Sequence, residues 1–299
     1  MTPGQHTLPR STWLLLAALT VGWGLNWPMM KIALAEVPVW TLRAVSLVAG
    51  AAGIFLIAWG AGRALLPPRE HWARLASSSL FNVTLWNLCV AYGLLHLPAG
   101  RTVILAYTMP IWVVLLSRLV LRESLTRRRM AGLALGMAGM ALLIGDELAL
   151  LRAAPIGALL VIGAAIAWAV GTVLVKRFPT DLPTTSFTGW QLAIGGLPVI
   201  LGALILDHDK WHPVGSWAAV AVAYNMLVAF IFCHWAWFKI VSRASAGVSA
   251  LGTLMIPVVG VLSSMLVLGE RPSWQEYAAL ASVIGAIATV VIPRRQLAR

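Results

Sequence analysis

The chain contains one apolar stretch twice, AGRTVILAYTMPIWVVLLSRLVLRE at residues 99–123 and AGVSALGTLMIPVVGVLSSMLVLGE at residues 246–270. Each copy begins with Ala-Gly, has a proline in its middle and ends on Glu. An apolar run of this length can cross a bilayer as a helix, which needs about 20 residues. Other pairs keep a similar spacing: Trp23 with Trp168, Lys31 with Lys176, and Asn82 with Asn225. The sequence therefore predicts two related halves, residues 10–145 and 153–293.

The composition is that of a membrane protein. Of the 299 residues, 60% are hydrophobic and 11% are charged, whereas about 25% are charged in a typical soluble domain. The net charge of +12 does not indicate a nucleic-acid partner, because nucleic-acid binding needs a basic face on a soluble fold and no such domain is visible. Cys89 and Cys233 lie in apolar segments, where we interpret them as small buried side chains without a disulfide.

The apolar segments predict an all-α integral membrane protein with ten transmembrane helices, and hence a lipid bilayer around the chain. The first segment is too long for the core of a signal peptide, so we count it as a helix. The ten segments are 12–34, 38–60, 72–95, 99–121, 127–145, 155–176, 183–206, 214–239, 246–268 and 274–292.

The basic residues predict the orientation. If the N-terminus is cytoplasmic, 16 of the 22 Lys and Arg residues fall on the inner side, as the positive-inside rule requires, and both termini are cytoplasmic. The loop after the first copy (122–129, RESLTRRR) is strongly basic, whereas the loop after the second (269–276, GERPSWQE) is nearly neutral. With five helices in each half, the second half is expected to be inverted. Inverted repeats are typical of alternating-access carriers whose site lies near the midplane.

Sequence signatures of enzymes are missing: the chain has no GxxxxGK[ST], HExxH or GxSxG motif. We therefore expect no catalytic residues, no metal site and no cofactor. All ten carboxylates lie at segment ends or in loops. Since a transporter of cations usually keeps an acid inside the membrane, this placement favours a neutral or zwitterionic substrate.

The expected membrane interior carries aromatic and amide side chains, which we interpret as the substrate-binding site. Belt positions and helix-to-helix hydrogen bonds are the alternative explanation for such residues. His234 suits either proton coupling or a structural role. The candidates are Trp23, Asn26, Asn82, Trp86, Tyr107, Thr108, Trp168, Asn225 and His234.

Pro110 and Pro257 are predicted to kink the repeated helix, because a mid-helix proline removes a hydrogen bond and displaces the carbonyl four residues earlier. The freed carbonyls would accept hydrogen bonds from a substrate ammonium; a kink that serves packing alone is the alternative. Arg43 and Arg101 are bases in or near the membrane. We expect Arg101 to snorkel to the outer interface; contact with a carboxylate at the helix start is the alternative. Small residues in the fifth and tenth segments suggest a scaffold or a dimer surface.

With its two repeats and their closing motifs, Leu121-Arg122-Glu123 and Leu268-Gly269-Glu270, the sequence resembles the EamA-type drug/metabolite transporter superfamily. Within it, the chain is most similar to bacterial aromatic amino-acid exporters. The resemblance implies ten helices, a bacterial inner (plasma) membrane, and a central cavity between helices 1, 3, 4 and 6, 8, 9. Small multidrug pumps of the superfamily use an acidic residue in the first helix; Trp23, Asn26 and Trp27 stand there instead.

We therefore expect a secondary transporter that exports aromatic and other neutral amino acids by alternating access. A broad-specificity metabolite or drug exporter is the alternative within transport. A membrane scaffold and an intramembrane enzyme are the alternatives outside it. Uniport and proton antiport both fit the sequence, as do a monomer and a weak homodimer.

Overall fold

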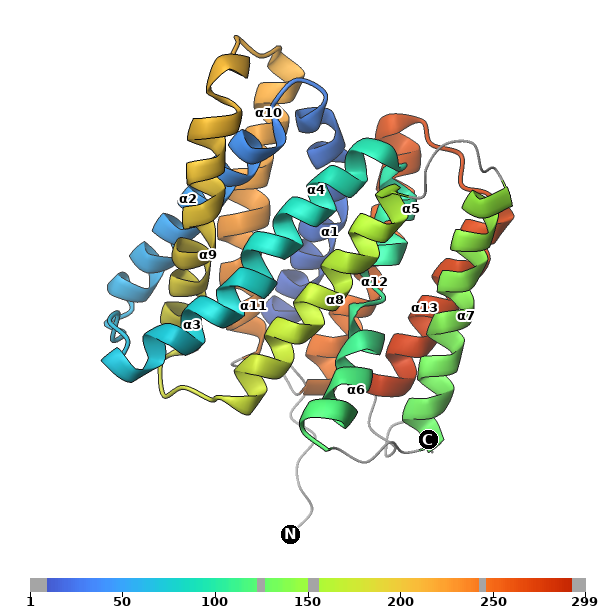
Figure 1. Ribbon diagram of the computed structural model, residues 1–299, viewed down its shortest axis with the longest axis horizontal. Coiled ribbons are helices and arrows are strands. Elements are labelled where there is room, and N and C mark those ends of the chain that lie inside the picture. Colours follow the sequence, from blue (N-terminus) through green and yellow to red (C-terminus); the bar gives the residue numbers. More distant parts are fainter. Residues whose placement is uncertain (1–9, 123–126, 150–155, 242–245, 292–299) are drawn as a thin grey trace.

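The computed structural model describes residues 10–122, 127–149, 156–241 and 246–291, and all regular structure in these residues is helical (Figure 1). The first half contains α1 (Arg10–Leu34), α2 (Val39–Gly60), η1 (Arg69–His71), α3 (Trp72–Ser79), η2 (Leu80–Leu85), α4 (Trp86–His96), α5 (Ala99–Ala106), α6 (Met109–Val120) and α7 (Arg127–Ala149). The second contains α8 (Ile156–Arg177), α9 (Thr184–Leu206), η3 (His208–Lys210), α10 (Ser216–Tyr224), η4 (Asn225–Phe232), α11 (Cys233–Val241), α12 (Ala246–Leu268) and α13 (Trp274–Val291).

Several short helices join into longer ones, and six of the resulting helices in the described residues are long and apolar enough to cross a membrane. Helices are the expected form, because backbone groups in lipid must form their hydrogen bonds within the segment. The prediction of an all-helical, multi-pass membrane protein is confirmed, while ten spans and cytoplasmic termini stay predictions. The six helices are Val39–Gly60, Arg69–His96, Ala99–Val120, Ile156–Arg177, Thr184–Leu206 and Ser216–Trp237.

The loops lie at two opposite ends of the bundle, and polar contacts join the loops at each end. At one end, which we call the carboxylate end, acidic side chains accept backbone N–H groups at the starts of helices: Glu36 from Gly215 at 2.6 Å and Asp207 from Thr41 at 2.9 Å. At the other, which we call the basic end, the Trp190 indole donates to the Leu65 carbonyl at 2.6 Å. Helix directions place these basic residues at the basic end: Arg63, Arg69, Arg74, Arg118, Arg122, Arg127, Lys176, Arg177 and Lys239.

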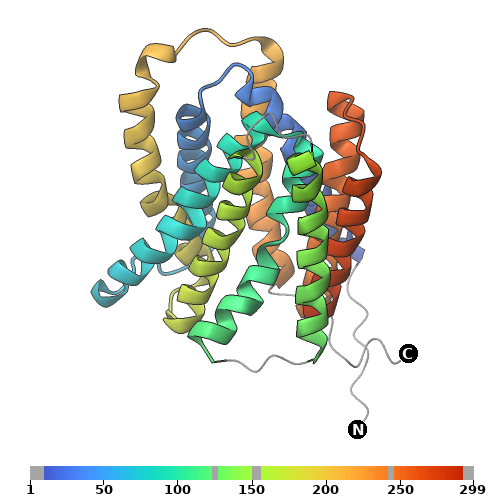
Figure 2. The same cartoon turned by 45° about the vertical axis from the view of Figure 1, so that its right-hand side comes forward.

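The fifth and tenth expected segments, α7 and α13, lie side by side at one edge of the bundle, opposite α2 and α9 (Figures 1 and 2). Glycines allow this close approach, since a Cβ at Gly132 would lie 2.0 Å from Thr289 Oγ1 and one at Gly139 would lie 2.8 Å from Ser282 Cβ. The predicted small-residue face is therefore used within the chain, as a scaffold.

Two π-helical segments interrupt the third and eighth expected segments, and nothing in the residue pattern predicts them. Segment η2 contains Asn82, and η4 begins at Asn225, so each holds one of the two repeat-related asparagines. A π-helical turn is wider than an α-helical one and occurs frequently at functional sites. The repeat thus extends from residue types to an unusual backbone form.

The repeat also extends to a left-handed backbone position where the repeated helix ends. Gly269 has φ 68°, and the corresponding residue of the first copy, Arg122, has φ 57°. Glycine adopts this conformation freely, whereas a residue with a Cβ is strained in it by about 1–2 kcal/mol. The first half therefore carries strain at a position where the second half has none.

Replacing Arg122 by glycine is expected to stabilise the protein by about 1 kcal/mol, because it relieves this strain. The measurement is thermal unfolding of the purified protein in one detergent. Arg122→Ala is the matched control, since it removes the same charge and keeps the strain. Equal melting temperatures for the two variants would contradict the prediction.

Candidate functional site

Polar side chains from both halves meet inside the bundle, in a group that we call the amide cluster: Asn26, Ser46 and Asn225. The Asn225 side-chain N–H donates to Asn26 Oδ1 at 2.8 Å. The Ser46 hydroxyl, which donates to the Leu42 carbonyl at 2.8 Å, also lies 3.4 Å from Asn225 Oδ1. Asn225 is fully buried. The cluster therefore joins α1 and α2 to the π-helical start of η4.

Aromatic rings surround the next turn of η4. The Trp23 indole donates to the Ala229 carbonyl at 3.2 Å, and His234 Nδ1 lies 3.1 Å from the same oxygen. A carbonyl oxygen can only accept a hydrogen bond, so Nδ1 must be the donor in this contact. A neutral His234 therefore carries its proton on Nδ1. The two rings meet edge to face with centroids 5.7 Å apart. The structure thus brings Trp23 and His234 together with the predicted Asn26 and Asn225.

A second group of predicted residues lies between η2, α4 and α8. The rings of Trp86 and Trp168 contact each other with centroids 5.0 Å apart. Asn82 is buried, and its Oδ1 has no hydrogen-bond partner among the described residues. Gly171 makes room for it, because a Cβ there would lie 2.0 Å from Asn82 Oδ1. Asn82 therefore faces α8, while its repeat partner Asn225 faces α1.

The helix is broken near one of the two repeat-related prolines and continuous through the other. The fourth segment is broken, since α5 ends at Ala106 and Pro110 lies in the first turn of α6, where a missing N–H is tolerated. By contrast, α12 continues through Pro257 as one helix. Between α5 and α6, the buried Thr108 hydroxyl donates to the Leu105 carbonyl at 2.7 Å and accepts from the Trp112 indole at 3.3 Å. The hydrogen-bonding capacity of Thr108 is thus used locally, and Tyr107 beside it is buried.

The carboxylate end is closed by contacts between the halves. Glu270 accepts the backbone N–H groups of Ala99 at 2.6 Å and Gly100 at 2.9 Å, and Arg101 pairs with Glu276 at 3.2 Å. The expectation that Arg101 snorkels was wrong: its side chain is 11% exposed, because a buried carboxylate lies within reach. The Glu that closes each copy of the repeat drew attention to Glu270 in the sequence, but its partners Ala99 and Gly100 appear only in the structure.

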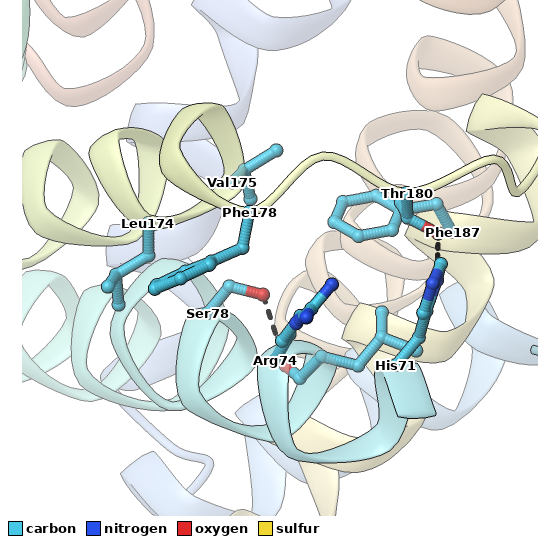
Figure 3. A pocket seen from close by; sticks show the side chains of 9 residues that line it. His71, Arg74, Ser78, Leu174, Val175, Phe178, Thr180 and Phe187 are labelled. Carbon is cyan, nitrogen blue, oxygen red and sulfur yellow. Dashed lines mark hydrogen bonds between the residues drawn. The ribbon is translucent and has the colours of Figure 1, made fainter. Parts of the chain in front are cut away.

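The pocket in Figure 3 lies at the basic end, between α3, α8 and α9, and the residues that line it are not among the predicted site residues. His71 Nδ1 and the Thr180 hydroxyl are 2.6 Å apart across its rim, and Arg74 lies over the Phe178 ring. The predicted aromatic and amide groups instead pack against one another. Trp23 contacts His234 and Trp86 contacts Trp168, on helices between which the resemblance implies a central cavity. Within the described residues, no three His, Cys, Asp or Glu side chains are grouped so that they could hold a metal ion.

The helices and the polar interior define a multi-pass helical membrane protein with a core shared between two halves. The sequence pattern of the EamA-like transporter family matches residues 10–145 and 155–292. The chain therefore belongs to the EamA-like transporter family, in the drug/metabolite transporter superfamily.

Known relatives agree with this membership. The uncharacterized transporter YvbV of Bacillus subtilis is 28% identical over 292 residues, which cover 95% of this chain and 92% of the relative. The probable amino-acid metabolite efflux pump of Salmonella typhimurium is 26% identical over 275 residues, which cover 88% of this chain and 89% of the relative. The fold is also similar to that of a protein solved by crystallography, with a TM-score of 0.64 and 25% sequence identity; the match covers 97% of this chain and 99% of that protein's chain.

Proposed function

We propose that this transporter exports amino acids, aromatic and other neutral ones, across a bacterial inner membrane. In this proposal two inverted five-helix halves alternate between inward-open and outward-open states, with both termini in the cytoplasm. The basic end would be cytoplasmic, because Lys and Arg concentrate on that side of membrane proteins.

The amide cluster is the observation that carries the proposal. It places hydrogen-bonding groups from both halves inside the membrane, next to the Trp23 ring. Buried amides suit the ammonium and carboxylate of an amino acid, and aromatic rings offer stacking surface to its side chain. A rocking motion of one half against the other would change this cluster directly. The name of the Salmonella relative, a probable amino-acid metabolite efflux pump, supports the same substrate class.

The placement of acidic groups supports the choice of substrate. The described carboxylates lie at the two ends of the bundle, and four of those at the carboxylate end, Glu36, Asp207, Glu270 and Glu276, accept backbone N–H groups or pair with Arg101. A lipophilic cation would need an acid inside the membrane. A broad metabolite or drug exporter remains the second candidate, which a substrate panel separates from the first.

Uptake of labelled amino acids into liposomes that contain the purified protein tests the proposal. We expect saturable uptake of several neutral amino acids. In Trp168→Ala we expect the uptake rate to be lower by about tenfold, because the variant loses an aromatic contact worth about 0.5–1.5 kcal/mol and the ring surface for the substrate. Trp217→Ala is the matched control, because this ring is 75% exposed at the start of α10.

No uptake of any amino acid by folded, inserted protein would contradict the amino-acid assignment and move the search to other metabolites. Equal loss in both tryptophan variants would remove Trp168 from the site. Conversion of a substrate in detergent would favour an enzyme. A pH gradient across the liposome tests proton antiport, and His234→Gln then tests whether the imidazole carries the proton.

A further inference from the structure

A guanidinium group lies buried in the apolar part of α2. Arg43 is 3% exposed and lies one turn inside the helix start, within a largely apolar span of 22 residues. Burying a charge in the membrane is costly, and such residues are usually retained for a function. A long basic side chain so close to a helix end would ordinarily extend to the interface. Arg43 does not.

The partners of Arg43 leave its charge without compensation. Its Nη2 group donates to the Met30 sulfur, which is a weak acceptor, and its Nε has no hydrogen-bond partner. Within the described part of the chain, no carboxylate forms an ion pair with it. Nε and Nη2 form one edge of the guanidinium, the edge that binds a carboxylate through two parallel hydrogen bonds. That edge is therefore covered only by a thioether.

The helix geometry places Arg43 beside the amide cluster. Ser46 follows Arg43 by three residues on α2, and Met30 follows Asn26 by four on α1, so each pair shares a helix face. Arg43 reaches Met30, and Ser46 approaches Asn225, which binds Asn26. One cation and the amide cluster thus line the same contact between α1, α2 and η4.

We propose that Arg43 binds the carboxylate of the transported substrate, so that the site selects molecules that carry a carboxylate. The carboxylate displaces the Met30 thioether from the Nε–Nη2 edge, and the amide cluster holds the neighbouring polar groups. The inference rests on the proposed transport function, and it names the chemical group that the site requires.

Matched carboxylate and amide ligands test the inference: phenylalanine against phenylalaninamide, and phenylacetate against phenylacetamide. In wild-type protein we expect each carboxylate to bind about 10- to 100-fold more tightly than its amide, as for one charge-assisted contact. Affinity is measured by thermal stabilisation in detergent and by competition for uptake into liposomes. Arg43→Gln is expected to bring the two affinities of each pair together. Arg63→Gln, which removes one charge from an exposed position, keeps them apart.

The comparison within each pair separates binding from folding, because a purely structural role of Arg43 would weaken both ligands equally. If Arg43→Gln lowers the affinity for the acid and for the amide equally, the inference is overturned. It is also overturned if the wild-type protein binds the acid and the amide equally well. If phenylacetate binds through Arg43 and no amino acid does, the amino-acid proposal fails and the carboxylate site stands. If amino acids are transported and Arg43→Gln keeps the preference for acids, the amino-acid proposal stands and the carboxylate site at Arg43 fails.

Discussion

Gly157→Leu is expected to destabilise the folded protein by about 3 kcal/mol or more, at the upper end of the cost of overpacking a core. Gly157 lies at the start of α8, where this helix crosses the end of α4. A Cβ there would lie 2.8 Å from His96 Cβ and 2.9 Å from Leu97 Cγ, and the Gly93 carbonyl is 3.4 Å away. His96 Cβ is fixed to the backbone of α4 and cannot move aside as the end of a flexible side chain could. The fraction of folded protein after extraction and its melting temperature measure the effect.

Gly163→Leu is the matched control on the same helix. A Cβ at Gly163 would meet nothing within 4 Å, so a leucine there extends away from the bundle. We expect this variant to keep the melting temperature of the wild type, because leucine favours both the helix and a lipid-facing position. Similar losses in both variants would mean that glycine serves the α8 backbone itself and not the crossing with α4.

Glu270→Gln is expected to loosen the carboxylate end of the bundle. Glu270 accepts two N–H groups at the start of α5, where the helix dipole favours a negative charge. A glutamine has one acceptor oxygen, so one N–H loses its partner and the other loses a charged acceptor. Hydrogen bonds to charged groups contribute about 1.5–3 kcal/mol, which corresponds to roughly a 10- to 100-fold shift between closed and open states.

Thiol labelling measures this shift. A cysteine at Thr102, which is fully buried in the first turns of α5, would react with a polar maleimide only when the end opens. In a protein with Cys89 and Cys233 replaced by alanine, we expect Glu270→Gln to raise the labelling rate about tenfold or more. Glu70→Gln is the control, because that side chain is 75% exposed at the basic end. An unchanged rate in Glu270→Gln would show that other contacts keep the end closed.

The sequence by itself determined the class of fold and the repeat. Apolar segments long enough to cross a membrane predict the helices around Trp23, Asn82, Trp168 and Asn225 before any contact is known. Matching residues at a similar spacing predict the repeat. These signals are local, since each depends on one segment and the solvent around it. The concentration of Lys and Arg in particular loops is local in the same sense.

The tertiary structure alone decided which of these residues meet. Asn82 and Asn225 correspond in the repeat, and each faces the equivalent position of the other half, Gly171 and Asn26, but only the packing of the halves shows that these positions meet. The π-helical segments and the left-handed Arg122 also have no signal in their own residue types, and the same residue type breaks the helix at Pro110 but not at Pro257. A hydrogen bond or a buried charge depends on which helices cross and at what height, and residues from distant segments decide that together. Arg43 is the clearest case: the sequence indicates only a base in or near the membrane, and the tertiary packing buries it, with its guanidinium against Met30.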